Sequence, residues 1–173
     1  MRKIILQVAV SLDMYIEGPN GEYDWCFDAN DVGMKEFLQG IDTILYGRKS
    51  WELMVREAEA MGPNPFGKKE NIVVSNTLTE VAGAKLISGD IAAEIARLKS
   101  GSGKNIWLFG GASLTASLMN ARLVDELQLA VHPIVLGSGK PLFQGIDGRV
   151  KTSLADCKTY DFDLVMLTYT VVK

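Results

Sequence analysis

Apolar runs typical of strands alternate with helix-like runs along most of this sequence, and that alternation restricts the fold to a sheet covered by helices. The first run, residues 3–11, is rich in β-branched and apolar residues, which is typical of a strand buried on both faces. Helical spacing appears in runs such as Trp51, Met54, Val55 and Ala58. We therefore predict an α/β fold with a largely parallel sheet and the first strand near its centre.

Turn and capping residues divide the rest of the chain into further elements. Residues 12–30 contain a dense turn signal, GPNG, so a long loop is predicted there. Asp31 and Asp90 stand where helices would be capped, and Gly40 and Gly101 where those helices would end. Further strands are predicted at residues 43–46, 71–74, 84–87, 105–109 and 127–131. The tail predicts an antiparallel hairpin over residues 151–160 and 163–172.

Composition narrows the kind of partner that the chain can have. With 173 residues and 47% hydrophobic content, residues 1–173 are expected to form one domain. The net charge of −3 offers no basic field for nucleic acid or for anionic lipid. No apolar run approaches the roughly 18 residues of a membrane span, and the N-terminus does not resemble a signal peptide. We therefore expect a cytoplasmic protein that binds neither nucleic acid nor membrane.

Metal and nucleophile chemistry have little support in the sequence. Cys26 and Cys157 lie far apart and form no CxxC pattern, so they are expected to be free thiols. His132 is the sole histidine and ends an alternating apolar run. A structural role for it is favoured over a zinc site or a Ser-His-Asp triad, each of which would need its imidazole. We predict no metal site.

Small or basic residues follow three of the predicted strands. In an open α/β sheet, ligands bind outside the carboxyl ends of strands, where helix N-termini present free N–H groups to phosphate. The Rossmann fingerprint GxGxxG is absent, so a dinucleotide site would have another architecture. The three turns are Gly47-Arg48-Lys49-Ser50, Ser75-Asn76 and Gly110-Gly111-Ala112-Ser113.

The order of several short motifs resembles the dihydrofolate reductase superfamily, and most closely the branch related to the C-terminal reductase domain of the bifunctional riboflavin-biosynthesis protein. The resemblance covers residues 4–143, with the C-terminal hairpin matching in pattern only. It implies a three-layer α/β/α fold, hydride transfer from NADPH to a small planar heterocycle that is pterin-like or pyrimidine-like, and a homodimer. The motifs are AVSLDMYI, a DW pair, DTILYGRKSWE, VVSN, LFGGASL and HPIVLGSGKPLF.

The same resemblance assigns cofactor contacts. It implies that Arg48 and its neighbours meet the adenosine 2′-phosphate and the pyrophosphate, that Ser75 and Asn76 meet the adenosine end, and that Ala9 and Ile16 lie near the nicotinamide. It also implies a cis peptide bond between Gly110 and Gly111. The full cofactor set is Ala9, Ile16, Gly47, Arg48, Lys49, Ser50, Ser75, Asn76, Gly110, Gly111, Ala112, Ser113 and Leu114.

The proton donor and the substrate are less defined. Asp13 matches the acidic residue of the family's SLDG motif, with Met14 in place of glycine, while Asn30 occupies the position of the folate reductase acid and Asp31 follows it. Asp13 and Asp31 are thus the candidate catalytic carboxylates. Trp25 and Phe27 are candidates to stack on a flat substrate.

Two alternatives remain. A genuine dihydrofolate reductase is disfavoured by Asn30, and a nucleotide-binding module without turnover, acting as a sensor or a partner-binding protein, is favoured by the lack of an evident proton donor. The activity that the resemblance implies is like that of a 5-amino-6-(5-phosphoribosylamino)uracil reductase or of a dihydrofolate reductase. Phe109 stands where riboflavin reductases often carry a glutamate, and the loss of that carboxylate counts against their ribosylaminopyrimidine substrate.

Overall fold

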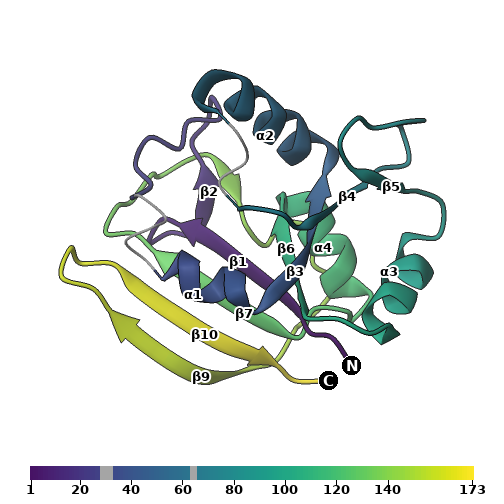
Figure 1. Cartoon of the computed structure of the whole chain (residues 1–173). Coiled ribbons are helices and arrows are strands. Elements are labelled where there is room, and N and C mark those ends of the chain that lie inside the picture. Colours follow the sequence, from purple (N-terminus) through teal and green to yellow (C-terminus); the bar gives the residue numbers. More distant parts are fainter. Residues whose placement is uncertain (28–32, 63–65) are drawn as a thin grey trace.

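The computed structural model describes residues 1–27, 33–62 and 66–173, and its largest feature is a twisted central sheet (Figure 1). Within the described residues eight strands form this sheet, in the order β5-β4-β3-β6-β1-β7-β10-β9. The strands are β1 (Ile4–Val10), β3 (Ile41–Gly47), β4 (Glu70–Val74), β5 (Lys85–Ile87), β6 (Asn105–Gly110), β7 (Glu126–Val131), β9 (Thr152–Thr159) and β10 (Val165–Val171).

Most of the strands in this sheet are parallel. Six neighbouring strands, β5, β4, β3, β6, β1 and β7, pair parallel to one another, and β1 lies between β6 and β7. The C-terminal strands β9 and β10 pair antiparallel, and β10 adds antiparallel to β7. The predicted mixed, mostly parallel sheet with an antiparallel C-terminal hairpin is therefore confirmed.

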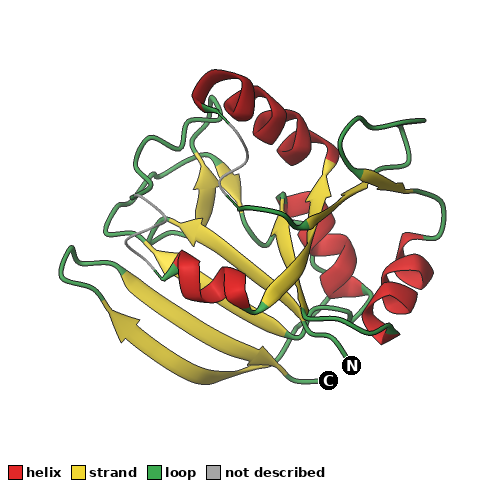
Figure 2. Cartoon of the chain, in the orientation of Figure 1, coloured by secondary structure: helices red, strands yellow, loops and turns green. Residues whose placement is uncertain are grey.

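Helices cover both faces of the sheet and make the predicted three-layer arrangement (Figure 2). On one face lie α1 (Met34–Gln39) and α2 (Arg48–Met61), and on the other lie α3 (Ile91–Ser100) and α4 (Ala112–Asn120). The caps of α3 agree with the sequence, since Asp90 accepts a hydrogen bond from the Ala93 N–H at 3.1 Å and Gly101 follows the last turn.

The two cores use alternate residues of the same strands. Ile4 and Leu6 of β1 are buried with residues of α3 and α4, whereas Ile5 is buried with Trp107 and residues of α1 and α2. This period of two is what a strand covered on both faces requires. Gln7 comes next on the face of Ile5 and is also buried.

The structure departs from the sequence predictions in two places. The long loop after β1 contains a short strand, β2 (Tyr15–Glu17), which pairs antiparallel with β8 (Lys140–Pro141). Strands of this length carry too little alternation to be detected in a sequence. The N-cap position of α1 belongs to Gly33 rather than Asp31, and Asp31 lies outside the described residues.

None of the helices in the described ranges is long and apolar enough to cross a bilayer.

Candidate functional site

Three neighbouring strands bring the predicted phosphate-binding turns together. Strand β3 lies between β4 and β6 and is parallel to both, so the turns that follow these strands meet at one edge of the sheet. Figure 1 shows α2 leaving the end of β3 at this edge. These turns are far apart in the sequence, and they become adjacent because their strands are neighbours in the sheet.

The turn after β3 touches the turn after β6. A β-carbon placed on Gly47 would lie 3.4 Å from the Gly110 carbonyl oxygen and 3.5 Å from the Gly111 nitrogen. Gly110 has a φ of 112°, a conformation that favours glycine, and the Gly110–Gly111 peptide bond is cis, as the resemblance implied. A β-carbon on Gly111 would lie 3.5 Å from Ser50 Oγ, so all four residues belong to one small cluster.

Both helices that begin in this cluster lack a side-chain cap. Gly47 is the N-cap residue of α2 and Gly111 that of α4, and neither helix start is capped by a side-chain hydrogen bond. The Thr115 N–H donates to the Gly111 carbonyl at 3.0 Å, so the N–H groups of the residues between them have no intrahelical acceptor. Unpaired N–H groups and a partial positive charge at each helix start make this cluster suitable for an anion. We call Gly47, Ser50, Gly110 and Gly111 the anion cluster.

Arg48 connects this cluster to the turn after β4. Its Nη1 donates to Thr77 Oγ1 at 3.4 Å, and its Nε contacts the Glu52 carboxylate at 2.7 Å. Thr77 Oγ1 lies 3.1 Å from Ser75 Oγ. Sequence reasoning missed Thr77, although it follows Ser75-Asn76 directly and adds a hydroxyl to the same turn.

Asn76 and Lys49 lie at the margins of the cluster. The Asn76 side-chain oxygen accepts a hydrogen bond from the Gly89 N–H at 2.8 Å, which joins its turn to the loop before α3. Lys49 is exposed on the first turn of α2. The Asn76 side chain is thus engaged with the loop before α3, and the Lys49 side chain is exposed to solvent.

Asp13 holds two loops together at the exit of β1. Its carboxylate accepts hydrogen bonds from Ser11 Oγ at 2.6 Å, from the Gly137 N–H at 2.7 Å and from the Leu136 N–H at 3.1 Å. The hydrogen bond from Ser11, with help from those of Gly137 and Leu136, lowers the pKa of Asp13 below its ordinary value. Asp13 is therefore ionised at neutral pH and serves to position the loops around the end of β1.

The residues expected near the nicotinamide lie on two different elements. Ala9 is near the end of β1 and pairs with Ala130 of β7. Ile16 lies in β2 and packs against the core on the α3 and α4 side. The side chain of Ala9 is on the other face of the sheet, since it alternates with Val8 and Val10.

His132 anchors the aromatic loop that follows β2. It is 3% exposed, and its Nε2 accepts a hydrogen bond from the Phe27 N–H at 3.1 Å. The Nδ1–H therefore donates to the Ala130 carbonyl, 2.9 Å away. Burial lowers the pKa of His132 below its ordinary value, which keeps the imidazole neutral. The histidine therefore has the structural role that the sequence predicted, because it fixes the backbone of the aromatic loop at Phe27.

Aromatic rings extend this anchor to the C-terminal hairpin. Trp25 and Phe27 lie against the His132 ring, with centroids at 5.3 and 4.9 Å. Phe27 also meets Phe162 at the tip of the hairpin, at 5.0 Å, and Phe162 meets Tyr160 at 5.6 Å. Tyr160 and Phe162 were missed, although two aromatic residues at a hairpin tip are an evident signal in the sequence.

A groove of about 320 Å³ opens beside this aromatic cluster, on the α1 face of the sheet. Its floor is formed by Gln7 of β1 and Gln128 of β7, which are paired neighbours. One wall comes from the start of α1, with Gly33, Glu36 and Phe37.

The other wall of the groove is the C-terminal hairpin, with Asp156, Lys158, Tyr160 and Met166. The two walls approach each other at one end, because a β-carbon on Gly33 would lie 3.4 Å from the Tyr160 hydroxyl oxygen. Among the described residues, neither Trp25 nor Phe27 lines this groove. These two candidates face the histidine and the hairpin tip instead.

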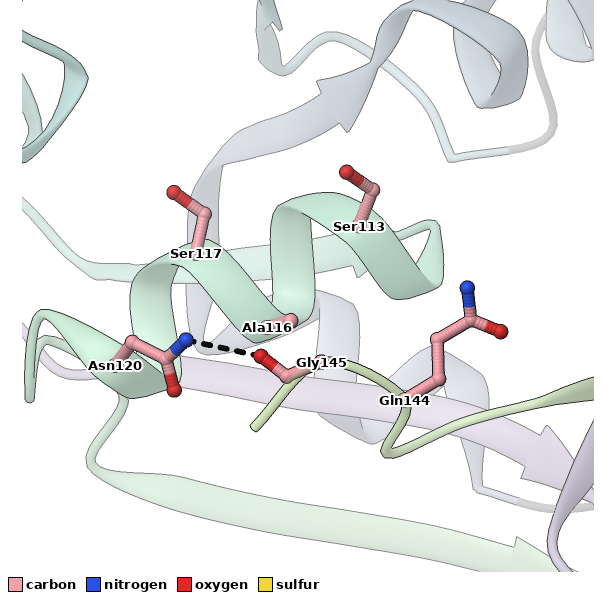
Figure 3. Close-up of a pocket in the computed structure, with 6 residues that line it drawn as sticks. All are labelled: Ser113, Ala116, Ser117, Asn120, Gln144 and Gly145. Carbon is pink, nitrogen blue, oxygen red and sulfur yellow. Dashed lines mark hydrogen bonds between the residues drawn. The ribbon is translucent and has the colours of Figure 1, made fainter. Parts of the chain in front are cut away.

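A second cavity, of about 430 Å³, lies along α4 (Figure 3). Asn120 closes one end, donating from Nδ2 to the Gly145 carbonyl at 2.9 Å. Ser113 is the residue that this cavity shares with the α4 turn at the anion cluster. The other lining residues are Ala116, Ser117 and Gln144.

The described residues contain no group of three or more His, Cys, Asp or Glu side chains placed to hold a metal ion. Cys26 and Cys157 are both free thiols, as the sequence predicted.

Comparison with known proteins agrees with this geometry. The RibD C-terminal domain family matches residues 2–166. The chain is 42% identical to the uncharacterized protein YyaP of Bacillus subtilis (strain 168), over 97% of this chain and 94% of that protein. It is 33% identical to the uncharacterized protein YwjB of the same organism, over 92% of each.

Solved structures give the same result. A putative riboflavin biosynthesis protein from Shewanella sp. PV-4 is similar over 100% of both chains, with 27% identity and a TM-score of 0.84. A Thermotoga maritima diaminohydroxyphosphoribosylaminopyrimidine deaminase/5-amino-6-(5-phosphoribosylamino)uracil reductase shares the fold, at 16% identity and a TM-score of 0.74, over 99% of this chain and 57% of that one. The sequence family, the sheet topology and these structural neighbours together show that the chain belongs to the RibD C-terminal domain family, with the dihydrofolate reductase-like fold that the sequence predicted.

Proposed function

We propose that this protein is an NADPH-dependent reductase that transfers a hydride to a small planar heterocycle of the pyrimidine or pterin type. The observation that carries the proposal is the contact between the uncapped starts of α2 and α4, at Gly47 and at Gly110 and Gly111. Membership of the RibD C-terminal domain family supports the reaction type. When bound, NADPH would supply the hydride.

The residues of the cluster fit the phosphates of such a cofactor. The N–H groups at the starts of α2 and α4, including those of Ala112, Ser113 and Leu114, would hold the pyrophosphate. Ser50 Oγ, close to Gly111, would add a hydrogen-bond donor. Glycines at this point allow a phosphate to approach the backbone.

The adenosine end of the cofactor fits the turn after β4. Arg48 already contacts Thr77 there, beside Ser75 and Asn76. We assign to Arg48 the 2′-phosphate that distinguishes NADPH from NADH, because its guanidinium can form two charge-assisted hydrogen bonds to a phosphate. Lys49, exposed one residue further along, would add only a long-range attraction.

The proton side of the reaction involves different residues. Hydride transfer to a C=N bond requires a proton for the nitrogen. The lowered pKa of Asp13 makes it a poor donor and suits it to positioning the loops next to Ala9 and Ile16. We propose that Asp31, which precedes Gly33 by two positions in the sequence, orients the substrate or relays the proton.

The commitment of Asp13 to three hydrogen bonds also favours one alternative, a nucleotide-binding module without turnover. A turnover assay separates the two. NADPH oxidation, followed by its absorbance, is measured with dihydrofolate, pterins, flavins and aminopyrimidines as acceptors. Oxidation that depends on one acceptor class supports the reductase. Tight NADPH binding with no oxidation across the whole panel would favour the module.

A further inference from the structure

Gln7 is a polar residue in the middle of an apolar strand, and its side chain has no hydrogen-bond partner among the described residues. It is 6% exposed. Its backbone carbonyl accepts a hydrogen bond from Trp107 Nε1 at 3.0 Å, but its side-chain amide makes none within the described ranges of the chain. An amide has two donors and an acceptor oxygen. Neither amide atom of Gln7 is among the fully buried side-chain atoms that lack a partner, so the amide reaches the groove that Gln7 lines, where a ligand would replace water. The amide therefore suits a partner that comes from outside the chain.

The surroundings of Gln7 fit a flat ring. Phe37 on one wall of the groove and Tyr160 on the other present aromatic surface, and Met166 adds apolar contact. Gln128, beside Gln7 on the floor, has part of its amide engaged, because its Nε2 donates to Glu126 at 2.7 Å. Aromatic and apolar side chains beside an available amide are typical of sites that orient a small planar ligand.

The charges of the groove limit the substituents that such a ring can carry. Glu36 and Asp156 line it with Lys158, whose Nζ lies 4.6 Å from the centroid of the Tyr160 ring. Among the described residues that line the groove, two carboxylates and one ammonium leave a net negative charge. A phosphate monoester would be repelled here, and a neutral ring would not.

We infer that this groove binds a neutral heterocycle without a phosphate group, and that Gln7 determines its specificity by reading a lactam edge. The Gln7 amide would donate to a ring carbonyl and accept from the adjacent ring N–H. Pyrimidinediones and pterins carry such an edge. The inference rests on the proposed function and makes its substrate class more specific, since Ala9, expected near the nicotinamide, follows Gln7 on the same face of β1.

The lactam edge is tested by binding alone, without NADPH. The probes are 5,6-diaminouracil and 5,6-diamino-1,3-dimethyluracil, in which both ring N–H donors are methylated. The side-chain amide resonances of Gln7 in a ¹⁵N-labelled sample report whether the probe reaches the groove. We expect 5,6-diaminouracil to shift them and the dimethyl compound to bind about tenfold more weakly or worse. Equal binding of both, or no shift with millimolar 5,6-diaminouracil, would overturn the inference.

Two variants of similar shape provide the control. Gln7→Leu should weaken 5,6-diaminouracil by about tenfold to a hundredfold without lowering the melting temperature, because the lost amide has no partner in the fold. Gln128→Leu makes the same change on the same floor, where the amide already bonds to Glu126, and should weaken the probe much less. Equal losses from both variants would mean that Gln7 reads no edge.

Uridine and uridine 5′-monophosphate test the charge argument. Both carry the lactam edge, and they differ in the phosphate. We expect uridine to bind at least as tightly as the monophosphate, and tighter binding of the monophosphate would contradict the inference.

These results separate the inference from the proposed function. Lactam binding at Gln7 in a protein that never oxidises NADPH would support the groove and contradict the reductase. Turnover that is indifferent to Gln7→Leu would do the reverse.

Discussion

At the scale of single residues, Arg48 is the side chain that we expect to select the cofactor. Arg48→Ala should weaken NADPH binding by about 1.5 kcal/mol or more, roughly tenfold, because a charge-assisted hydrogen bond to the 2′-phosphate is lost. NADH, which lacks that phosphate, should bind nearly as before. Lys49→Ala is the matched control, since Lys49 is the adjacent exposed cation. Calorimetry that shows equal losses of NADPH and NADH for Arg48→Ala would contradict the assignment.

His132 makes stability depend on pH in a defined direction. Burial lowers the pKa of His132 in the folded protein, so the unfolded chain binds the proton more readily. The contribution of the neutral histidine is complete above the unfolded pKa of about 6.5 and is lost as the pH falls below it. His132→Gln keeps an acceptor for the Phe27 N–H but cannot be protonated in this range.

The measurement for His132 is the melting temperature between about pH 7.5 and pH 5.5. Between these two pH values, the melting temperature of the native protein should fall further than that of the His132→Gln variant. Parallel curves for the two proteins would show that the histidine does not control the pH dependence.

At the scale of elements, the start of α4 carries the anion-binding argument. Gly111 has a φ of −82°, which any residue can adopt, and an added β-carbon would be in ordinary contact with Ser50 Oγ. Gly111→Val should therefore leave a folded protein while its side chain obstructs the approach of a phosphate to the helix start. We expect NADPH binding to be abolished or reduced by about a hundredfold.

Gly40→Ala is the control for that variant. Gly40 also has a φ of −82°, but it lies at the end of α1 and outside the anion cluster. The Gly40→Ala variant should retain NADPH binding in the same calorimetric titration. If Gly111→Val bound NADPH as tightly as Gly40→Ala, the start of α4 would not hold the phosphates.

The elements also show where sequence reasoning succeeds. Long strands such as β1 and caps such as Asp90 were predictable because local chemistry determines them. The strands β2 and β8 were not, because each depends on the other as a partner 120 or so residues away and has little pattern of its own. The start of α1 was placed too early, since an aspartate that can cap a helix is no guarantee that the helix begins there.

At the scale of the whole molecule, the sequence does not show which distant segments become neighbours in the fold. The resemblance named the three turns residue by residue, and the sheet order explains why they meet. The groove was not predicted, because Gln7 and the hairpin residues Asp156 and Tyr160 become neighbours only when β10 pairs with β7. A glutamine inside the apolar run of β1 was the available signal, and its meaning depends on that neighbourhood.

The most direct test of the central claim is a titration of ¹⁵N-labelled protein with NADPH, followed by the backbone amide resonances. If the paired starts of α2 and α4 hold the cofactor phosphates, the largest shifts will fall on residues 47–50 and 110–114, with smaller shifts at Ser75 and Asn76. If NADPH leaves the amides of residues 47–50 and 110–114 unshifted, whether it binds elsewhere or does not bind, the account of this site is wrong.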